Sequence, residues 1–361
     1  MNGNQIYLDG MSALDYLKNL NTDMNNSHKS LKEMTISDRL YIASNVYVLY
    51  PRFKEILASI DDCHHLSNLK DEPECLFLKG ETGAGKTTIL KSYTQNYPRY
   101  QTADSTIVPV LEVTIPSPAT VKSVVTKLLW ELGDPAYDKG TTSNQTIRLI
   151  GLMKDSGVSL VFLDEFQHFI DRDSAKVLKT VSDWLKNLIL DTKVPVVLIG
   201  LPEAETVNQF NPQLTRRFAA RHTLSPFSWD DSGREFRTCL HAVESQLPLI
   251  EESNLACEEM ALRFYYASDG IVAYVMKLIR YGTNLALKCG QEKLDLNVLA
   301  SAFYKYVKAD KPHKKNPFID SDFLNEVKDN SRLSVNITVG ATNNRIKAKK
   351  KTTKASDILH K

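Results

Sequence analysis

The chain has 361 residues, 42% of them hydrophobic, which is enough for two or three domains with packed cores. Its 45 basic and 43 acidic residues leave a formal charge of +2, so the overall charge identifies no partner. Five scattered cysteines without a CxxC pair, and the lack of any apolar run near ~18 residues, argue against zinc-binding, disulfide-rich, secreted and membrane-spanning classes, so we expect a cytoplasmic protein without a membrane segment.

The N-terminal part is predicted to be a polar arm followed by two helices. Residues 1–36 are rich in Asn, Lys and Ser and are interpreted either as a disordered arm or as an arm with one short helix. Ser37 can cap a helix over DRLYIASNVYVLY, which Pro51 interrupts, and a second helix is predicted over 52–60.

A phosphate-binding loop is the most specific motif in the chain. Residues 76–90 read LFLKGETGAGKTTIL, a short apolar strand followed by the full pattern GxxxxGK[ST] and the start of a helix. An ordinary glycine-rich turn would not explain this strand and helix. We therefore predict binding of ATP with Mg²⁺, with Lys86 reaching the β- and γ-phosphates and the Thr87 hydroxyl on the metal. The predicted nucleotide-binding residues are Gly80, Glu81, Thr82, Gly83, Ala84, Gly85, Lys86, Thr87 and Thr88.

Apolar strands alternate with helices after this loop. The predicted elements are a strand over 106–115, a helix over 121–133, a polar loop over 134–145, a helix over 146–155, a strand over 158–166, a helix over 175–190 and a strand over 194–200. This alternation is typical of a parallel, doubly wound sheet, so the predicted fold class is α/β, with a P-loop sheet sandwiched by helices.

Strand signals end near Trp229, and the rest of the chain reads as helical. The predicted helices cover 235–245, 258–266, 272–289 and 296–307 and form a small all-α domain. The predicted division is an N-terminal arm over 1–36, a nucleotide-binding domain with its leading helices over 37–228, a helical lid over 229–309, and a linker with a basic tail over 310–361.

Two acids follow the apolar strand LVFL at 160–163. Acids at the carboxyl end of a central strand lie where α/β sheets bind ligands. We predict that Asp164 holds the Mg²⁺ opposite Thr87 and that Glu165 polarises the attacking water as general base. The alternative is a pair of surface acids at a strand end, but the phosphate loop upstream favours the catalytic interpretation.

Two consecutive arginines lie in NPQLTRRF, at 211–218. Arg216 and Arg217 are candidates for an arginine finger, a guanidinium that reaches a neighbouring subunit's γ-phosphate and neutralises charge in the transition state. The alternative is a pair of solvated arginines on a helix, which residue physics alone favours.

These motifs together resemble an AAA+ ATPase, and more narrowly the TniB/TnsC family of target-selection regulators of transposons that use a DDE transposase. The matching stretches are VYVLYPRFKEIL, GETGAGKTTIL, VPVLEVTIPSPATVKSVVTKLLWELGDP, LVFLDEFQHF, VPVVLIGLPEAE and NPQLTRRF, within residues 37–290. The resemblance implies an ATPase that oligomerises with ATP as a ring or helical filament on double-stranded DNA. It also implies recruitment by a TniQ-type target-selection protein, contact with the DDE transposase, and a bacterial cytoplasmic location on DNA.

The sequence departs from this family at two sensor positions. The family usually has Gly-Thr at the end of the strand before PEA, whereas this chain has Gly200 and Leu201, so the polar sensor 1 is missing. Glu203 and Asn208 are possible substitutes. The sensor 2 arginine is also missing after Gly270, and Lys277 is a weak candidate. These departures predict slow hydrolysis that DNA or a partner stimulates.

The resemblance also implies which residues face DNA. They lie after the second strand and along the following helix and loop: Thr120, Lys122, Lys127, Lys139 and Thr141. Lysines and hydroxyls there would contact phosphates without reading sequence. A solvated helix face is an equal alternative. The basic tail can likewise bind DNA or remain solvated.

Two other functions remain open from the sequence. One is a signalling P-loop NTPase of innate defence of the STAND type, which shares the phosphate loop and the helical lid. The other is a nucleotide-gated DNA scaffold with negligible hydrolysis. Stimulation of hydrolysis by double-stranded DNA distinguishes the first of these from a transposition regulator. Comparing assembly with ATP and with a non-hydrolysable analogue distinguishes the second.

Overall fold

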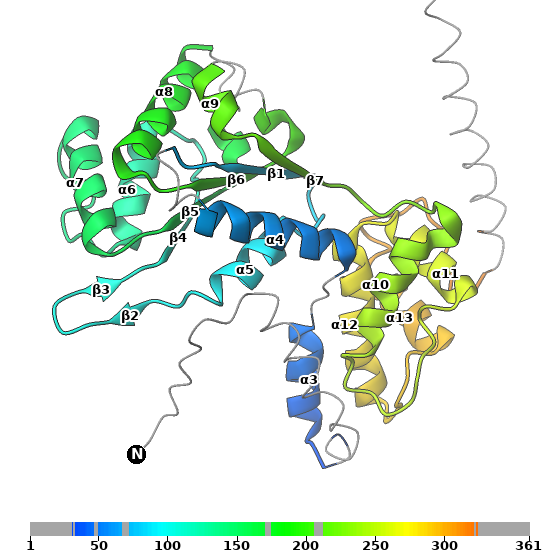
Figure 1. Cartoon of the computed structure of the whole chain (residues 1–361). Helices are drawn as coiled ribbons and strands as arrows, with labels where there is room; N and C mark the ends of the chain where they lie inside the picture. Colours follow the sequence, from blue (N-terminus) through cyan, green and yellow to red (C-terminus); the bar gives the residue numbers. More distant parts are fainter. Residues whose placement is uncertain are drawn as a thin grey trace, which may run out of the picture.

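The computed structural model describes residues 31, 33–46, 50–66, 72–169, 175–205, 212–320 and 323. The predicted basic tail, nearly all of the N-terminal arm and Asn208 lie outside these residues. In the described part, an α/β domain built on a parallel sheet is followed by a bundle of helices (Figure 1). The predicted α/β fold class with an all-α lid is confirmed.

The central sheet has five parallel strands in the order β4-β5-β6-β1-β7. Their bounds are Leu76–Gly80 for β1, Val110–Thr114 for β4, Leu160–Asp164 for β5, Val196–Gly200 for β6 and Ala220–Leu224 for β7. The sequence predicted four of them. All carboxyl ends meet at one edge of the sheet, which brings the phosphate loop after β1 and the acids of β5 to the same edge.

Helices cover both faces of the sheet because each central strand is apolar on both sides. Leu78 and Phe162 pack on one face with α4 (Pro51–Leu66) and α5 (Lys86–Thr94), in a core that continues into the helical domain. Phe77 and Leu163 pack in a second core on the other face. The helices of this second face are α6 (Val121–Glu131), α7 (Thr142–Asp155), α8 (Ala175–Thr192) and α9 (Pro212–Arg217).

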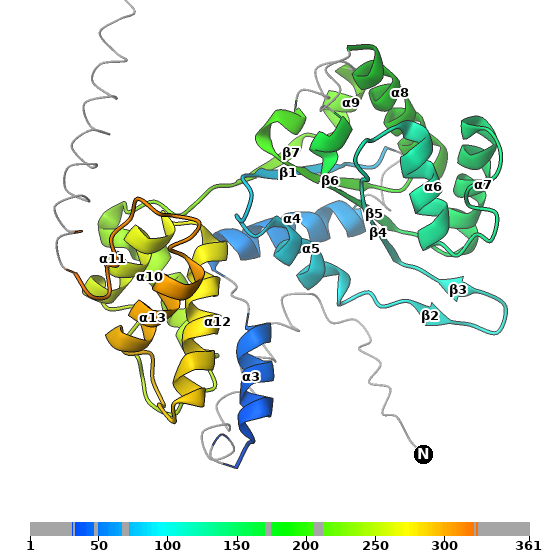
Figure 2. The ribbon, with the colours of Figure 1, turned by 180° about the vertical axis from the view of Figure 1, so that it is seen from behind.

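The strand predicted over 106–115 is wrong in its bounds, because Pro109 divides it. β3 (Thr106–Ile107) pairs with β2 (Tyr100–Gln101) in an antiparallel hairpin that projects from the sheet (Figure 2). Only the part after the proline, β4, joins the sheet. Pro109 has no N–H to donate, and its carbonyl accepts from Ser159 N at 2.8 Å.

The helical domain contains α10 (Arg234–Glu244), α11 (Glu258–Ser268), α12 (Val272–Lys288) and α13 (Leu296–Tyr306), close to the four predicted helices. A short turn, η5 (Asp231–Gly233), precedes them. Residues 310–320, predicted as linker, pack onto this domain instead. The ammonium groups of Lys311 and Lys314 both bind the Asp269 carboxylate, which fixes this segment to the end of α11.

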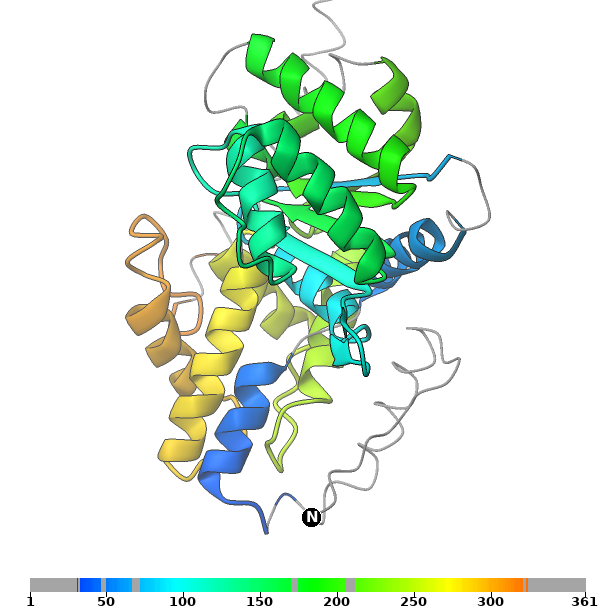
Figure 3. The same ribbon diagram turned by 90° about the vertical axis from the view of Figure 1, so that its left-hand side faces the viewer.

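The first described helix belongs with the helical domain and not with the sheet. α3 (Ile36–Asn45) lies along α12 (Figure 3). Its buried Arg39 donates to both carboxylate oxygens of Glu292 and, at 2.8 Å, to the carbonyl of Pro248. The N-cap is Thr35, whose side chain accepts from Asp38 N, so the prediction of Ser37 as cap is wrong by two residues.

Candidate nucleotide site

The phosphate loop joins β1 to α5 and requires glycine for steric reasons. Gly83 and Gly85 have φ of 81° and 107°, in the left-handed region that other residues avoid. Gly80 is needed because a Cβ there would lie 2.5 Å from the Leu224 carbonyl oxygen on β7. Gly85 is also the N-cap of α5: its carbonyl accepts from Thr88 N at 3.0 Å, but since it has no side chain, it supplies no side-chain cap to the first turn.

Lys86 lies buried over this loop. Its ammonium donates to the carbonyls of Gly80 at 2.6 Å and Glu81 at 3.1 Å. Burial lowers the pKa of Lys86, while the nearby carboxylates of Glu165 and Asp164 oppose that change. A desolvated ammonium stabilises an anion more strongly than a hydrated one, so this position suits a phosphate group.

Asp164 ends β5 and Glu165 follows it, with β6 between their strand and β1. The Asp164 carboxylate accepts a hydrogen bond from Glu165 N at 2.8 Å. Burial raises the pKa of Asp164, against the effects of that backbone hydrogen bond, of Lys86 and of the nearby Thr87 hydroxyl, which lower it. One hydroxyl and one carboxylate near each other fit Mg²⁺, which keeps several waters and binds few protein oxygens when phosphate is present.

Gln167 is a site residue that the sequence analysis missed. It lies in the turn η3 (Phe166–Phe169), directly after the two acids. Its Nε2 donates to the Glu165 carboxylate, and its Oε1 accepts from the N–H of Leu201, 3.1 Å away. The amide therefore lies at the end of β6, beside the position where the family resemblance places a polar sensor.

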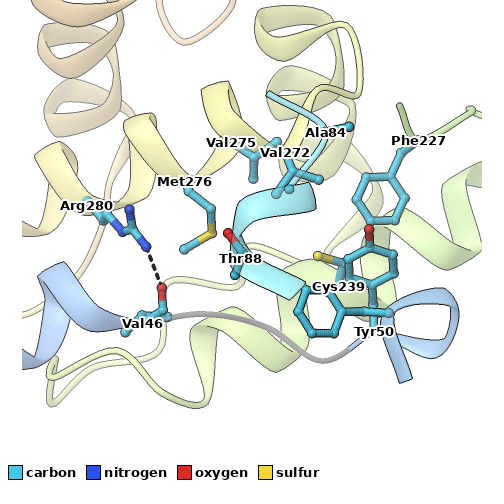
Figure 4. A pocket seen from close by; sticks show the side chains of 12 residues that line it. Val46, Tyr50, Ala84, Thr88, Phe227, Cys239, Val272, Val275, Met276 and Arg280 are labelled. Carbon is cyan, nitrogen blue, oxygen red and sulfur yellow. Dashed lines mark hydrogen bonds between the residues drawn. The ribbon is translucent and has the colours of Figure 1, made fainter. Parts of the chain in front are cut away.

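An apolar cavity opens beside the phosphate loop, between the sheet domain and α12 (Figure 4). Ala84, Gly85 and Thr88 form the wall on the loop side. The remaining wall comes from distant segments: Val46, Tyr50, Phe53, Phe227, Cys239, Val272, Val275, Met276 and Arg280. The lining is mostly apolar and adjoins the phosphate loop, which is the chemistry expected where a nucleotide base binds.

The helical domain touches the loop directly. Ala273 N donates to the Gly83 carbonyl at 3.0 Å, so the first turn of α12 rests on the phosphate loop. Lys277, the candidate for sensor 2, instead pairs with Asp310 at 2.9 Å. Arg280, about one turn later, lies in the cavity wall and donates to the Val46 carbonyl at 2.8 Å, and burial lowers its pKa.

The structure separates the two consecutive arginines. Arg216 is exposed near the end of α9. Arg217 is 8% exposed, and its Nη2 lies 3.4 Å from the Glu72 carboxylate. A finger that reaches a neighbouring subunit must be accessible, so Arg216 is the better candidate of the two.

The candidate DNA contacts have different surroundings. The hydroxyls of Thr120 and Thr141 accept from Ser123 N and Asn144 N as the N-caps of α6 and α7. Lys127 pairs with Glu131 at 3.1 Å, and its ammonium lies 3.6 Å from the ring centroid of Trp130. The side chain of Lys122 is exposed on α6. That of Lys139 is exposed before α7, with the Asp138 carboxylate 3.3 Å from its ammonium.

The five-stranded parallel sheet, the phosphate loop, the acids at the end of β5 and the helical lid define an AAA+ ATPase fold. Solved structures agree. The ORC2 protein of Aeropyrum pernix in ADPNP–ADP complexes is 16% identical, with 73% of this chain and 71% of that chain covered and a TM-score of 0.54. Cdc6p from Pyrobaculum aerophilum is 16% identical, with 74% of this chain and 71% of that chain covered and a TM-score of 0.53. The Aeropyrum pernix ORC1 protein in complex with DNA is also 16% identical, with 74% of this chain and 69% of that chain covered and a TM-score of 0.53.

A match to a family model identifies the chain more narrowly than its fold does. The model of the bacterial TniB protein family matches residues 39–228, so the chain belongs to the TniB family. The resemblance inferred from the motifs is thereby confirmed. No curated protein matches the sequence. Among the described residues, no helix is both long enough and apolar enough to cross a membrane.

Proposed function

We propose that this TniB-family protein is an ATP-dependent regulator of DNA transposition, which oligomerises with ATP on double-stranded DNA and links target-site selection to the transposase. One observation supports the binding and hydrolysis of ATP. The phosphate loop, the Thr87–Asp164 pair and Glu165 converge at one edge of the sheet, with an apolar cavity beside them. Membership of the TniB family supports the transposition part.

In the proposed reaction, Lys86 and the loop N–H groups hold the β- and γ-phosphates, and the cavity holds the base. Thr87 and Asp164 would bind Mg²⁺, which when present neutralises charge on the phosphates. Glu165 takes a proton from the attacking water, since its half-buried side chain lies beside Asp164 without being the metal ligand. Leu201 offers no polar side chain at the end of β6, which fits slow hydrolysis that DNA or a partner stimulates.

In the proposed assembly, subunits associate head to tail, so that one subunit's exposed Arg216 reaches the nucleotide of the next. Lys122 and Lys139 then line the DNA, and repetition of these lysines along the assembly supplies the attraction that a formal charge of +2 does not. The partners are a TniQ-type target-selection protein and a DDE transposase, in the bacterial cytoplasm on DNA.

The experiment measures binding to random-sequence double-stranded DNA over a salt series, with ATP and without nucleotide. The logarithm of the association constant should fall with the logarithm of salt by ~0.9 per phosphate contact, so the slope should be large only when ATP drives assembly. Replacing Lys122 and Lys139 by Ala should reduce the slope without changing nucleotide affinity. Lys288→Ala, which removes an exposed lysine from α12, is the matched control.

Equal slopes with and without ATP would refute ATP-dependent assembly on DNA. Hydrolysis that double-stranded DNA does not stimulate would favour a signalling NTPase. Full assembly with a non-hydrolysable analogue, together with negligible turnover under all conditions, would favour a nucleotide-gated scaffold.

A further inference from the structure

Gln167 joins two elements of the site that are separate in the sequence. Its side-chain Nε2 donates to Glu165, and its Oε1 accepts from Leu201 N at 3.1 Å. Leu201 follows β6, and β6 lies between β5 and β1. One amide thus connects the end of the strand that carries the acids with the end of the strand beside the phosphate loop.

The chemistry of the two partners fixes the direction of this amide. A backbone N–H can only donate, so Leu201 requires the carbonyl oxygen of Gln167. The NH₂ group then faces Glu165, whose carboxylate can only accept. A glutamate at position 167 could accept from Leu201 but would oppose Glu165 with a second negative charge, and an aliphatic residue could make neither bond.

The surrounding structure holds Gln167 in place. Phe166 and Phe169 of the same turn are buried and pack against each other, with ring centroids 5.3 Å apart. His168 Nδ1 lies 2.8 Å from the Ile115 carbonyl oxygen and ties the same turn to the segment after β4. At Gly200, an added Cβ would lie 3.0 Å from Gln167 Oε1, so the glycine leaves room for the amide.

We propose that Gln167 is the positioning residue for Glu165: it orients the carboxylate toward the attacking water and couples that orientation to the end of β6. This inference rests on the proposed ATPase function. It assigns to Gln167 the polar link at the end of β6 that Leu201 has no side chain to make. Because only the Oε2 oxygen of Glu165 meets the amide, the other carboxylate oxygen remains for water.

The test is a double-mutant cycle on single-turnover ATP hydrolysis, with nucleotide affinity measured for every protein. Gln167→Met keeps the length of the side chain and removes both hydrogen bonds. It should slow hydrolysis by roughly 10- to 100-fold, as expected for a misplaced catalytic group, and leave nucleotide affinity within about twofold. In a Glu165→Gln background it should cause no further slowing, because a positioning residue has no effect once its target is removed.

Two additional variants separate positioning from structure. Gln167→Glu keeps the acceptor for Leu201 and loses the donor to Glu165, so it should be as slow as Gln167→Met. Gln246→Met, at a half-buried lid glutamine that donates to the Ala242 carbonyl, is the control and should hydrolyse ATP at the wild-type rate.

Wild-type hydrolysis by Gln167→Met would overturn the inference. So would equal slowing in the wild-type and Glu165→Gln backgrounds, or slowing explained by weaker nucleotide binding, because either would indicate a structural role. If Glu165→Gln itself hydrolyses ATP normally, the proposed catalytic function fails first, and the two failures are therefore distinguishable.

Discussion

Arg216 and Arg217 are adjacent in sequence but differ in surroundings, which allows the arginine finger to be tested with a built-in control. Arg216→Ala removes an exposed guanidinium, so it should leave stability nearly unchanged. If that guanidinium completes a neighbour's site, hydrolysis by the assembled protein should fall by about 10³-fold or more. Arg217→Ala instead removes a side chain that is 8% exposed and should lower the free energy of unfolding by about 1–2 kcal/mol.

The decisive assay mixes two inactive proteins and measures phosphate release with DNA present. Arg216→Ala protein retains a good nucleotide site, and Lys86→Ala protein retains a good arginine. In an equal mixture with random head-to-tail neighbours, about one quarter of the interfaces join a good site to a good arginine. The mixture should therefore recover about one quarter of the wild-type rate.

Failure of the Arg216→Ala mixture to recover activity at any ratio would refute the finger in trans. Recovery with Arg217→Ala in its place would show that the wrong arginine was chosen. In that case Arg217 would have to leave its pairing with Glu72 on assembly, and hydrogen exchange in α9 should increase when ATP and DNA are added.

Three other outcomes are expected. Lys86→Ala should abolish ATP binding in a fluorescent-nucleotide titration, because it removes the charge that offsets the β- and γ-phosphates. Glu165→Gln should bind ATP normally, lose hydrolysis and persist longer on DNA, as measured by dissociation after ATP is removed. Burial lowers the pKa of His64 from 6.5 to about 4, so the unfolded chain takes up the proton first as pH falls. The contribution of neutral His64 to the free energy of unfolding is therefore full above pH ~6.5 and about 2 kcal/mol smaller at pH ~5. Urea titrations should show this loss for the wild type and not for His64→Phe.

The phosphate side of the site could be predicted because its residues are contiguous in the chain. A phosphate loop needs glycines, a lysine and a hydroxyl at fixed spacing, and the acids of β5 follow an apolar run that identifies a central strand. The strand β7 was missed for the opposite reason. It lies at the edge of the sheet and reads ARHTL, with exposed residues alternating along it, so it has no apolar run.

Gln167 and Arg280 could not be found from local pattern. Gln167 matters because the turn η3 places it against the N–H of Leu201, 34 positions away in the chain. Arg280 belongs to the cavity wall because α12 places it against the carbonyl of Val46. Each hydrogen bond depends on tertiary packing between distant segments, and an isolated glutamine or arginine in a helical or turn sequence carries no signal of it.

The site is divided between two domains, which explains why its phosphate side could be predicted from the sequence and the cavity beside it could not. The sheet domain supplies the phosphate loop and the acids, whereas the far wall of the apolar cavity comes from α12 and from Val46 and Tyr50. Since α3 itself is held on the helical domain through Arg39 and Glu292, Val46, which follows α3, belongs with the α12 residues to the lid side of the cavity. The contact of Ala273 N with the Gly83 carbonyl is then the direct mechanical link between lid and phosphate loop. Since α12 makes this contact and also forms part of the cavity wall, we expect a rotation of the lid to change both together.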